Sequence, residues 1–214
     1  MFRLTVLPTL LMLCFLASPA HAGIICSSPA LPPACGAYRT PAQVHADYAA
    51  GMFVLSDISH FGFLNVVITP MGADERETFD STVTGTMTIT PPGSSMPILM
   101  TGQVIVLTHG KTGNTTGTFD TEMLAMNLSG GGALVRESPT LPSLGRTTIT
   151  DQGGGLYRID SFFDVFTELS LDGGQTWMPS SGSTLVELVP EPSSLFLIAL
   201  GGFALPFLRP RRRS

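Results

Sequence analysis

The sequence lacks the short motifs that identify many catalytic sites. No serine stands in a Gly-x-Ser-x-Gly arrangement, and no two histidines have the His-x-x-x-His spacing of a helical metal site. The glycine triplets at 130–132 and 153–155 precede strand-like residues, whereas a phosphate-binding loop precedes a helix. The histidines after residue 22, namely His45, His60 and His109, are isolated and predicted to be surface or hydrogen-bonded residues. We therefore expect a non-enzymatic protein without a cofactor or bound metal.

Basic residues are scarce in the central part of the chain. Between residues 23 and 189, six basic residues stand against fifteen acidic ones, a net charge of −9 with histidine neutral. Such a charge repels the phosphate backbone, which argues against nucleic-acid binding. A stretch of this length suits one domain with a sizeable core. The six basic residues are Arg39, Arg76, Lys111, Arg136, Arg146 and Arg158.

The first 22 residues have the three parts of a secretory signal peptide. Arg3 supplies the positive start, residues 4–16 form an apolar run, and residues 20–22 read Ala-His-Ala, a small-x-small cleavage site. The run is shorter than the roughly 20 apolar residues of a transmembrane helix. We expect export through the Sec translocon, removal of residues 1–22 by signal peptidase, and a mature chain that begins at Gly23.

Cysteine is almost absent. The chain has three, and Cys14 lies in the apolar run of the predicted signal peptide, so Cys26 and Cys35 remain after export. An even pair in an exported chain favours a disulfide, which would stabilise the fold by roughly 2–3 kcal/mol. A zinc site is the alternative, but two cysteines without a nearby histidine cannot supply four ligands.

The last 25 residues combine three features in a fixed order. Pro190, Glu191 and Pro192 form a Pro-Glu-Pro box, and its prolines stop a strand or helix from continuing out of the preceding domain. Residues 195–208 are apolar and predict a short C-terminal transmembrane helix. A basic cluster at the very end is held on the cytoplasmic side, which places the domain outside the cytoplasm. The cluster consists of Arg209, Arg211, Arg212 and Arg213.

This arrangement resembles the PEP-CTERM sorting signal of bacterial exported proteins, and residues 117–190 look like a block found in uncharacterised members of that group. The resemblance implies that an exosortase, a membrane enzyme, recognises residues 190–214 and removes them near the box. The precursor would then reside in the inner membrane, and the mature protein at the cell surface or in the extracellular matrix. A permanent C-terminal anchor is the alternative.

Residues 23–189 have little helical character. Apolar and polar residues alternate in short runs separated by glycine, proline, asparagine and aspartate, and the longest amphipathic helical stretch is a weak one at 41–50. This pattern predicts a single all-β domain, organised as a β-sandwich or a jelly-roll-like fold. The expected strands are 61–69, 82–90, 100–108, 117–128, 133–137, 147–150, 157–171 and 183–189.

One turn carries a recognisable motif. Residues 170–177 read Ser-Leu-Asp-Gly-Gly-Gln-Thr-Trp and resemble an Asp-box, the hairpin motif of sialidase-type propellers. The resemblance implies that the aspartate ties down the backbone of the turn and that the tryptophan packs beneath it. A propeller requires several such boxes and this chain has one, so the motif does not indicate a glycosidase. The residues of this turn are Ser170, Asp172, Gly174, Thr176 and Trp177.

Acidic residues are the remaining candidates for chemistry. Asp74, Glu75 and Glu77 cluster in an expected loop, and Asp160 and Asp164 flank two phenylalanines. Such carboxylates can bind Ca²⁺ or form the acid/base pair of a polysaccharide hydrolase, but solvated loop residues are the simpler interpretation.

The sequence favours an exported structural or adhesive module, with exopolysaccharide as a candidate partner. A lectin-like module that binds carbohydrate or calcium is the alternative. A secreted polysaccharide hydrolase is the third hypothesis.

Overall fold

The computed structural model describes residues 23–191, and its regular elements in this range are all β-strands, which confirms the predicted all-β class. The strands belong to one large antiparallel sheet. They are β1 (Ile24–Cys26), β2 (Gly36–Arg39), β3 (His45–Tyr48), β4 (Phe53–Met71), β5 (Asp74–Ile89), β6 (Ser94–Thr108), β7 (Gly117–Gly130), β8 (Ala133–Glu137), β9 (Ser143–Gly153), β10 (Leu156–Val165), β11 (Thr167–Ser170), β12 (Met178–Pro179) and β13 (Thr184–Pro190).

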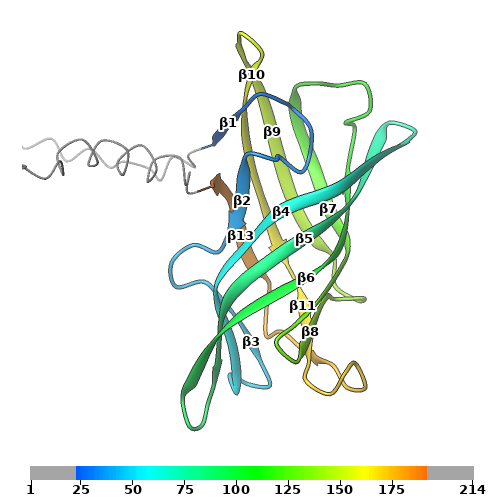
Figure 1. Cartoon of the computed structure of the whole chain (residues 1–214). Helices are drawn as coiled ribbons and strands as arrows, with labels where there is room; N and C mark the ends of the chain where they lie inside the picture. Colours follow the sequence, from blue (N-terminus) through cyan, green and yellow to red (C-terminus); the bar gives the residue numbers. More distant parts are fainter. Residues whose placement is uncertain (1–22, 192–214) are drawn as a thin grey trace, which may run out of the picture.

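The sheet closes on itself. The strands β2, β4, β5, β6, β7, β9, β10 and β13 each pair with the next in this order. The last of them, β13, returns to β2, with Leu188 opposite Tyr38. These strands therefore form a cylinder with simple up-and-down connections (Figure 1). The predicted sandwich or jelly roll needs two facing sheets, whereas the hydrogen bonds here join all strands into one sheet.

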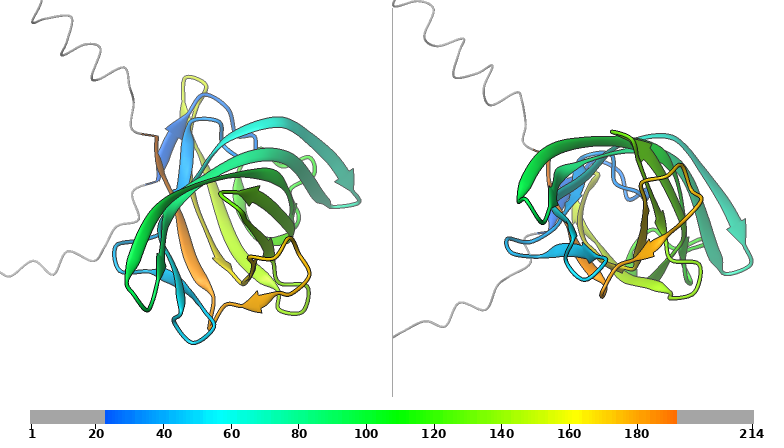
Figure 2. Two further views of the ribbon diagram at one scale, coloured as in Figure 1. Left: turned by 60° about the horizontal axis from the view of Figure 1, so that its bottom comes forward. Right: turned by 90° about the horizontal axis from the view of Figure 1, so that it is seen from below.

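The other strands extend the sheet at the two ends of the cylinder. β1 pairs with β10, while β8, β11 and β12 continue from β7 at the opposite end (Figure 2). β3 pairs with β4, and a bridge between Tyr48 and Ser180 joins it to the segment after β12. β3 lies inside residues 41–50, where the sequence showed only a weak helical pattern.

β4 is bent by three bulges. Its register with β5 shifts at three places, and each shift contains a residue with positive φ: Asp57 at 52°, Gly62 at 66° and Asn65 at 51°. A bulge adds an unpaired residue, bends the strand and increases its twist. β4 therefore follows the curve of the cylinder over residues 53–60, and its outer part then stands away from the ring together with β5 (Figure 2).

The core lies inside the cylinder, because alternate residues of each ring strand point inward. On β5, Phe79 and Val83 are buried while their neighbours are partly exposed, and β10 repeats the pattern with Ile159 and Phe163. Val104 on β6 has no exposed surface. An eight-stranded ring is just wide enough for its own side chains to fill the interior.

A short loop covers one end of the cylinder. Cys26 and Cys35 form a disulfide, with their Cα atoms 5.9 Å apart, and so tie together the ends of the loop that joins β1 to β2. Leu31, Pro32 and Pro33 of this loop are buried. We call residues 27–34 the cap.

Two predicted segments lie outside the described residues: the signal peptide (1–22), and the part of the C-terminal tail from Pro192 onward, including the apolar helix and the terminal arginines. Between residues 23 and 191, no helix is long and apolar enough to span a bilayer.

Candidate functional site

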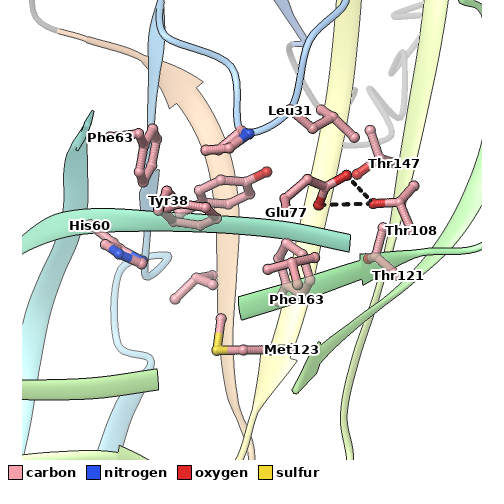
Figure 3. Close-up of a pocket in the computed structure, with 14 residues that line it drawn as sticks. Leu31, Tyr38, His60, Phe63, Glu77, Thr108, Thr121, Met123, Thr147 and Phe163 are labelled. Carbon is pink, nitrogen blue, oxygen red and sulfur yellow. Dashed lines mark hydrogen bonds between the residues drawn. The ribbon is translucent and has the colours of Figure 1, made fainter. Parts of the chain in front are cut away.

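The most unusual group in the lumen is the carboxylate of Glu77 on β5. It shares the inward-facing side of the strand with Phe79 and has 1% of its surface exposed. Thr108, on the neighbouring strand β6, donates its hydroxyl to Oε1 at 2.8 Å and to Oε2 at 3.1 Å (Figure 3). Among residues 23–191, Glu77 is the only acidic side chain in the buried core.

Burial raises the pKa of Glu77 to about 7. The hydrogen bond from Thr108 and the positive charge of Lys111 oppose this shift, whereas the negative charge of Glu75 adds to it. Glu77 therefore keeps its proton to a higher pH than an ordinary glutamate.

A chain of hydroxyl groups runs across the lumen beside Glu77. Tyr38 on β2 donates its phenol to Ser161 Oγ at 3.0 Å, and Ser161 lies 2.7 Å from the hydroxyl of Thr147. Burial raises the pKa of Tyr38, while the hydrogen bond to Ser161 lowers it. Tyr38 thus stays a neutral phenol and joins three ring strands through side-chain hydrogen bonds.

His60 on β4 lies deeper in the same lumen. Burial lowers its pKa to about 4, so its imidazole is neutral at physiological pH. Its ring contacts Phe63 edge-on at a centroid distance of 5.4 Å, and Phe63 contacts Tyr38 and Phe79 in the same way. His60 is therefore part of an aromatic cluster, and its Nε2 atom has no hydrogen-bond partner among residues 23–191.

The lumen contains two small cavities, of about 30 and 50 Å³. A water molecule needs roughly 10–15 Å³, whereas pockets for organic ligands measure about 300 Å³ or more. Three buried polar atoms that lack a partner in the described part of the chain belong to residues that line these cavities: His60 Nε2, Thr121 Oγ1 and Thr184 Oγ1. The cavities are large enough for single water molecules, but most of the residues that line them are apolar.

The Asp-box-like turn lies at the opposite end of the cylinder from the cap, between β11 and β12. The carboxylate of Asp172 accepts hydrogen bonds from the backbone N–H of Gln175 and Thr176 and from the hydroxyls of Ser170 and Thr176. Ser170 Oγ also accepts the N–H of Gly174 at 2.9 Å. These bonds, led by the one from the Thr176 hydroxyl, hold the pKa of Asp172 well below its usual range. Asp172 therefore organises the turn.

Trp177 is held from two sides. Its Nε1 donates to the carbonyl of Gly174 at 3.1 Å, and the guanidinium of Arg136 lies 4.0 Å from the centre of its ring. Arg136 also donates two hydrogen bonds to Glu168 Oε2, at 2.8 and 2.6 Å. These contacts attach the turn to β8 and β11, so Trp177 and Arg136 act here as structural residues.

The two ends of the described chain lie in one groove. Gly23 and Pro190 both line a groove of about 270 Å³ on the cylinder, together with Asp160 and Glu187. Pro190 is the last residue of β13 and pairs with Gly36. Of the predicted Pro-Glu-Pro box, Pro190 and Glu191 are described and both are exposed.

The acidic residues that were expected in a loop, Asp74, Glu75 and Glu77, lie on a strand. Asp74 and Glu75 begin strand β5 directly after its turn, and Asp74 accepts the backbone N–H of Gly110 at 2.8 Å. Asp160 and Asp164 lie on β10, on the opposite side from the inward-facing Phe163, and Asp160 pairs with Arg158 at 3.1 Å. Within the described range, no three histidine, cysteine or acidic residues are grouped to hold a metal ion.

The sequence placed Glu77 in a loop cluster and His60 among isolated surface or hydrogen-bonded histidines, and it predicted the burial of neither. Glu77 precedes Phe79 by two residues. The period-2 pattern of the predicted strand at 82–90, continued back toward the turn, places both side chains on the buried face. Recognising it required extending that strand back to the turn. His60 gave no such signal, because the bulges of β4 interrupt the alternation on both sides of it.

Comparisons with known proteins returned no match, whether against family models, curated protein sequences or solved structures.

Proposed function

We propose that this chain is an exported bacterial protein whose C-terminal segment is a PEP-CTERM sorting signal, processed by an exosortase. Its closed β domain would be a non-enzymatic structural or adhesive module at the cell surface or in the extracellular matrix. The observation that carries the proposal is the order of three features at the chain end: the Pro-Glu-Pro box at 190–192, the apolar stretch at 195–208 and the terminal arginines.

The position of the box relative to the domain supports processing. β13 completes the cylinder and ends at Pro190, so cleavage beyond the box removes none of its backbone pairs. Glu191 is exposed and follows the strand directly, which leaves the cleavage region open to an enzyme. Because Gly23 lies in the same groove as Pro190, both ends of the mature domain would emerge at one place.

The contents of the lumen support a structural function. A substrate needs space beside the reacting groups, but the cavities around Glu77 and His60 total less than about 100 Å³. Glu77 is instead bound to a threonine hydroxyl and covered by the cap.

The proposal is tested by following the chain in hosts with and without the exosortase. With the enzyme present, the mature protein loses the mass of the residues beyond the box and leaves the inner-membrane fraction. Replacing Pro190, Glu191 and Pro192 by alanine retains the full mass and the membrane location. A matched control, Ser193→Ala with Ser194→Ala, alters the neighbouring positions and is processed normally.

Intact-mass spectrometry and membrane fractionation distinguish the outcomes. Equal C-terminal masses in both hosts, or normal processing of the triple-alanine variant, would refute the sorting proposal.

A further inference from the structure

The outer part of β4 has an open edge. β3 and β2 pair with β4 only as far as His60, and residues 61–71 pair with β5 on their other side. Among the described residues, no strand covers this edge, which stands away from the cylinder on the β4–β5 hairpin (Figure 2). Its unpaired backbone groups can accept another strand.

This edge has none of the charges that usually protect an open strand. Residues 61–71 contain no charged side chain, although the domain carries a net charge of −9. Large apolar side chains are exposed along it: Leu64 at 64%, Val67 at 58%, Met71 at 54%, Ile68 at 42% and Val66 at 41%. Natural proteins usually protect such edges with charges, prolines or bulges, because exposed apolar edges associate.

The pairing with β5 shows which backbone groups face outward. Met71 pairs with Asp74 across the two-residue turn Gly72-Ala73, where Gly72 has a φ of 71° that suits the first position of a type II′ turn. The residues of such a closing pair bond to each other, so the N–H and C=O groups of alternate residues point the other way. Those of Ile68 therefore point to the open edge, while Val66 lies in the register shift between the paired residues Leu64 and Val67. Pro70 has the same orientation, but a proline has no backbone N–H group that could donate to another strand.

We propose that this edge pairs antiparallel with the same edge of a second copy of the chain, around a two-fold axis at Val67. Val66 of one copy then lies opposite Ile68 of the other, with backbone hydrogen bonds between them. The bulge at Asn65 and the missing N–H of Pro70 end the ladder on either side, which selects this register. The register is self-complementary, as a two-fold interface requires.

Charge opposes contact with a second copy less at this edge than elsewhere on the domain. Two domains of charge −9 repel each other, and a strand of 11 uncharged residues brings no like charges into direct contact. The proposed contact gives a surface module a means of self-association. Only this biological meaning rests on the proposed structural function, and the contact itself does not.

The decisive experiment measures the mass of the chain by sedimentation over a range of concentrations, using protein isolated after export. We expect a monomer–dimer equilibrium. Val67→Lys places two ammonium groups together at the axis and weakens dimerisation by at least about tenfold. Leu99→Lys is the matched control, since Leu99 is 60% exposed on β6 and away from this edge, and it leaves dimerisation within about twofold of the parent.

Two further variants test the register. Ile68→Pro removes an outward-facing N–H but no bond to β5, so it abolishes the dimer and leaves the melting temperature of the monomer nearly unchanged. Val67→Cys forms a disulfide across the axis under mild oxidation, because facing Cβ atoms lie roughly 4.5–5.5 Å apart. The native Cys26–Cys35 bridge leaves no competing thiol in the mature domain.

A chain that remains monomeric at millimolar concentration would overturn the proposal. So would a dimer that Val67→Lys does not weaken, or crosslinking of Leu99→Cys in place of Val67→Cys. Since these measurements use purified protein, failure of exosortase processing leaves them unaffected, and the two proposals fail separately.

Discussion

Glu77 and His60 share one lumen and respond to pH in opposite directions. The pKa of Glu77 rises from 4.5 to about 7 on folding, so its contribution to stability is present below pH 4.5 and is lost as the pH rises through 7. The pKa of His60 falls from 6.5 to about 4, so its contribution is present above pH 6.5 and is lost as the pH falls through 4. Between pH 4.5 and 6.5 the two effects partly cancel.

Single substitutions separate the two effects. Relative to the parent, Glu77→Gln gains stability as the pH rises from 4.5 to 7, by up to about 3 kcal/mol, since glutamine keeps the acceptor for Thr108 without the charge. His60→Gln gains stability relative to the parent as the pH falls from 6.5 to 4. Chemical denaturation across pH 4–8 gives the free energy of unfolding of each variant.

Comparison with the parent at each pH cancels the other titrating groups. Glu137 is the main one, because burial raises its pKa to about 7 as well and gives it the same sign as Glu77. If the curves of both variants ran parallel to that of the parent, the assignment of buried titrating groups would be wrong.

At the scale of single elements, the cap is the part that depends most on one covalent bond. The loop makes its buried contacts through Leu31, Pro32 and Pro33, and no strand of its own holds it in place. Changing Cys26 and Cys35 together to serine should lower the free energy of unfolding by about 2–3 kcal/mol, because the unfolded chain regains the freedom of the short loop.

The reducing agent dithiothreitol provides the control for the cap. It should destabilise the parent by a similar amount and leave the double-serine variant unchanged, as measured by thermal melting at fixed pH. Equal destabilisation of both proteins would mean that the bridge does not restrain the cap.

The sequence predicted several strands with regular alternation, missed the first half of β5 beside the turn, and missed part of β4 where the alternation breaks. β8 and β13 were predicted to within one residue, and buried and partly exposed residues alternate along most of both. The first half of β4 was missed because bulges at Asp57 and Gly62 shift the alternation. In the Asp-box-like turn, the side-chain bonds of Asp172 are local in sequence, which is why a short motif indicated the turn.

The closure of the whole molecule was beyond sequence reasoning. Alternation shows which face of a strand is buried, but the pairing of Tyr38 with Leu188 joins segments from opposite ends of the domain. A sandwich and a closed cylinder have the same local pattern and differ only in such distant pairs. For the same reason, no motif pointed to the lumen where Glu77, His60 and Tyr38 meet.

The cylinder should depend on its last strand. A chain that ends at residue 191 keeps β13 and should melt within a few degrees of the chain that ends at residue 214. A chain that ends at residue 182 leaves β2 and β10 without a common neighbour and removes Val186 and Leu188 from the core. We expect it to bind a hydrophobic dye and to unfold without a cooperative transition. A cooperative melt of the shorter chain, followed by circular dichroism, would contradict this.

Because the strand that completes the ring ends at Pro190, the domain reaches its final topology only after residue 190 has been synthesised. The next two residues complete the Pro-Glu-Pro box. During synthesis, the proposed sorting signal therefore follows directly after the strand that closes the fold. A chain interrupted anywhere before residue 190 lacks both, so the box marks only those molecules that possess every strand of the cylinder.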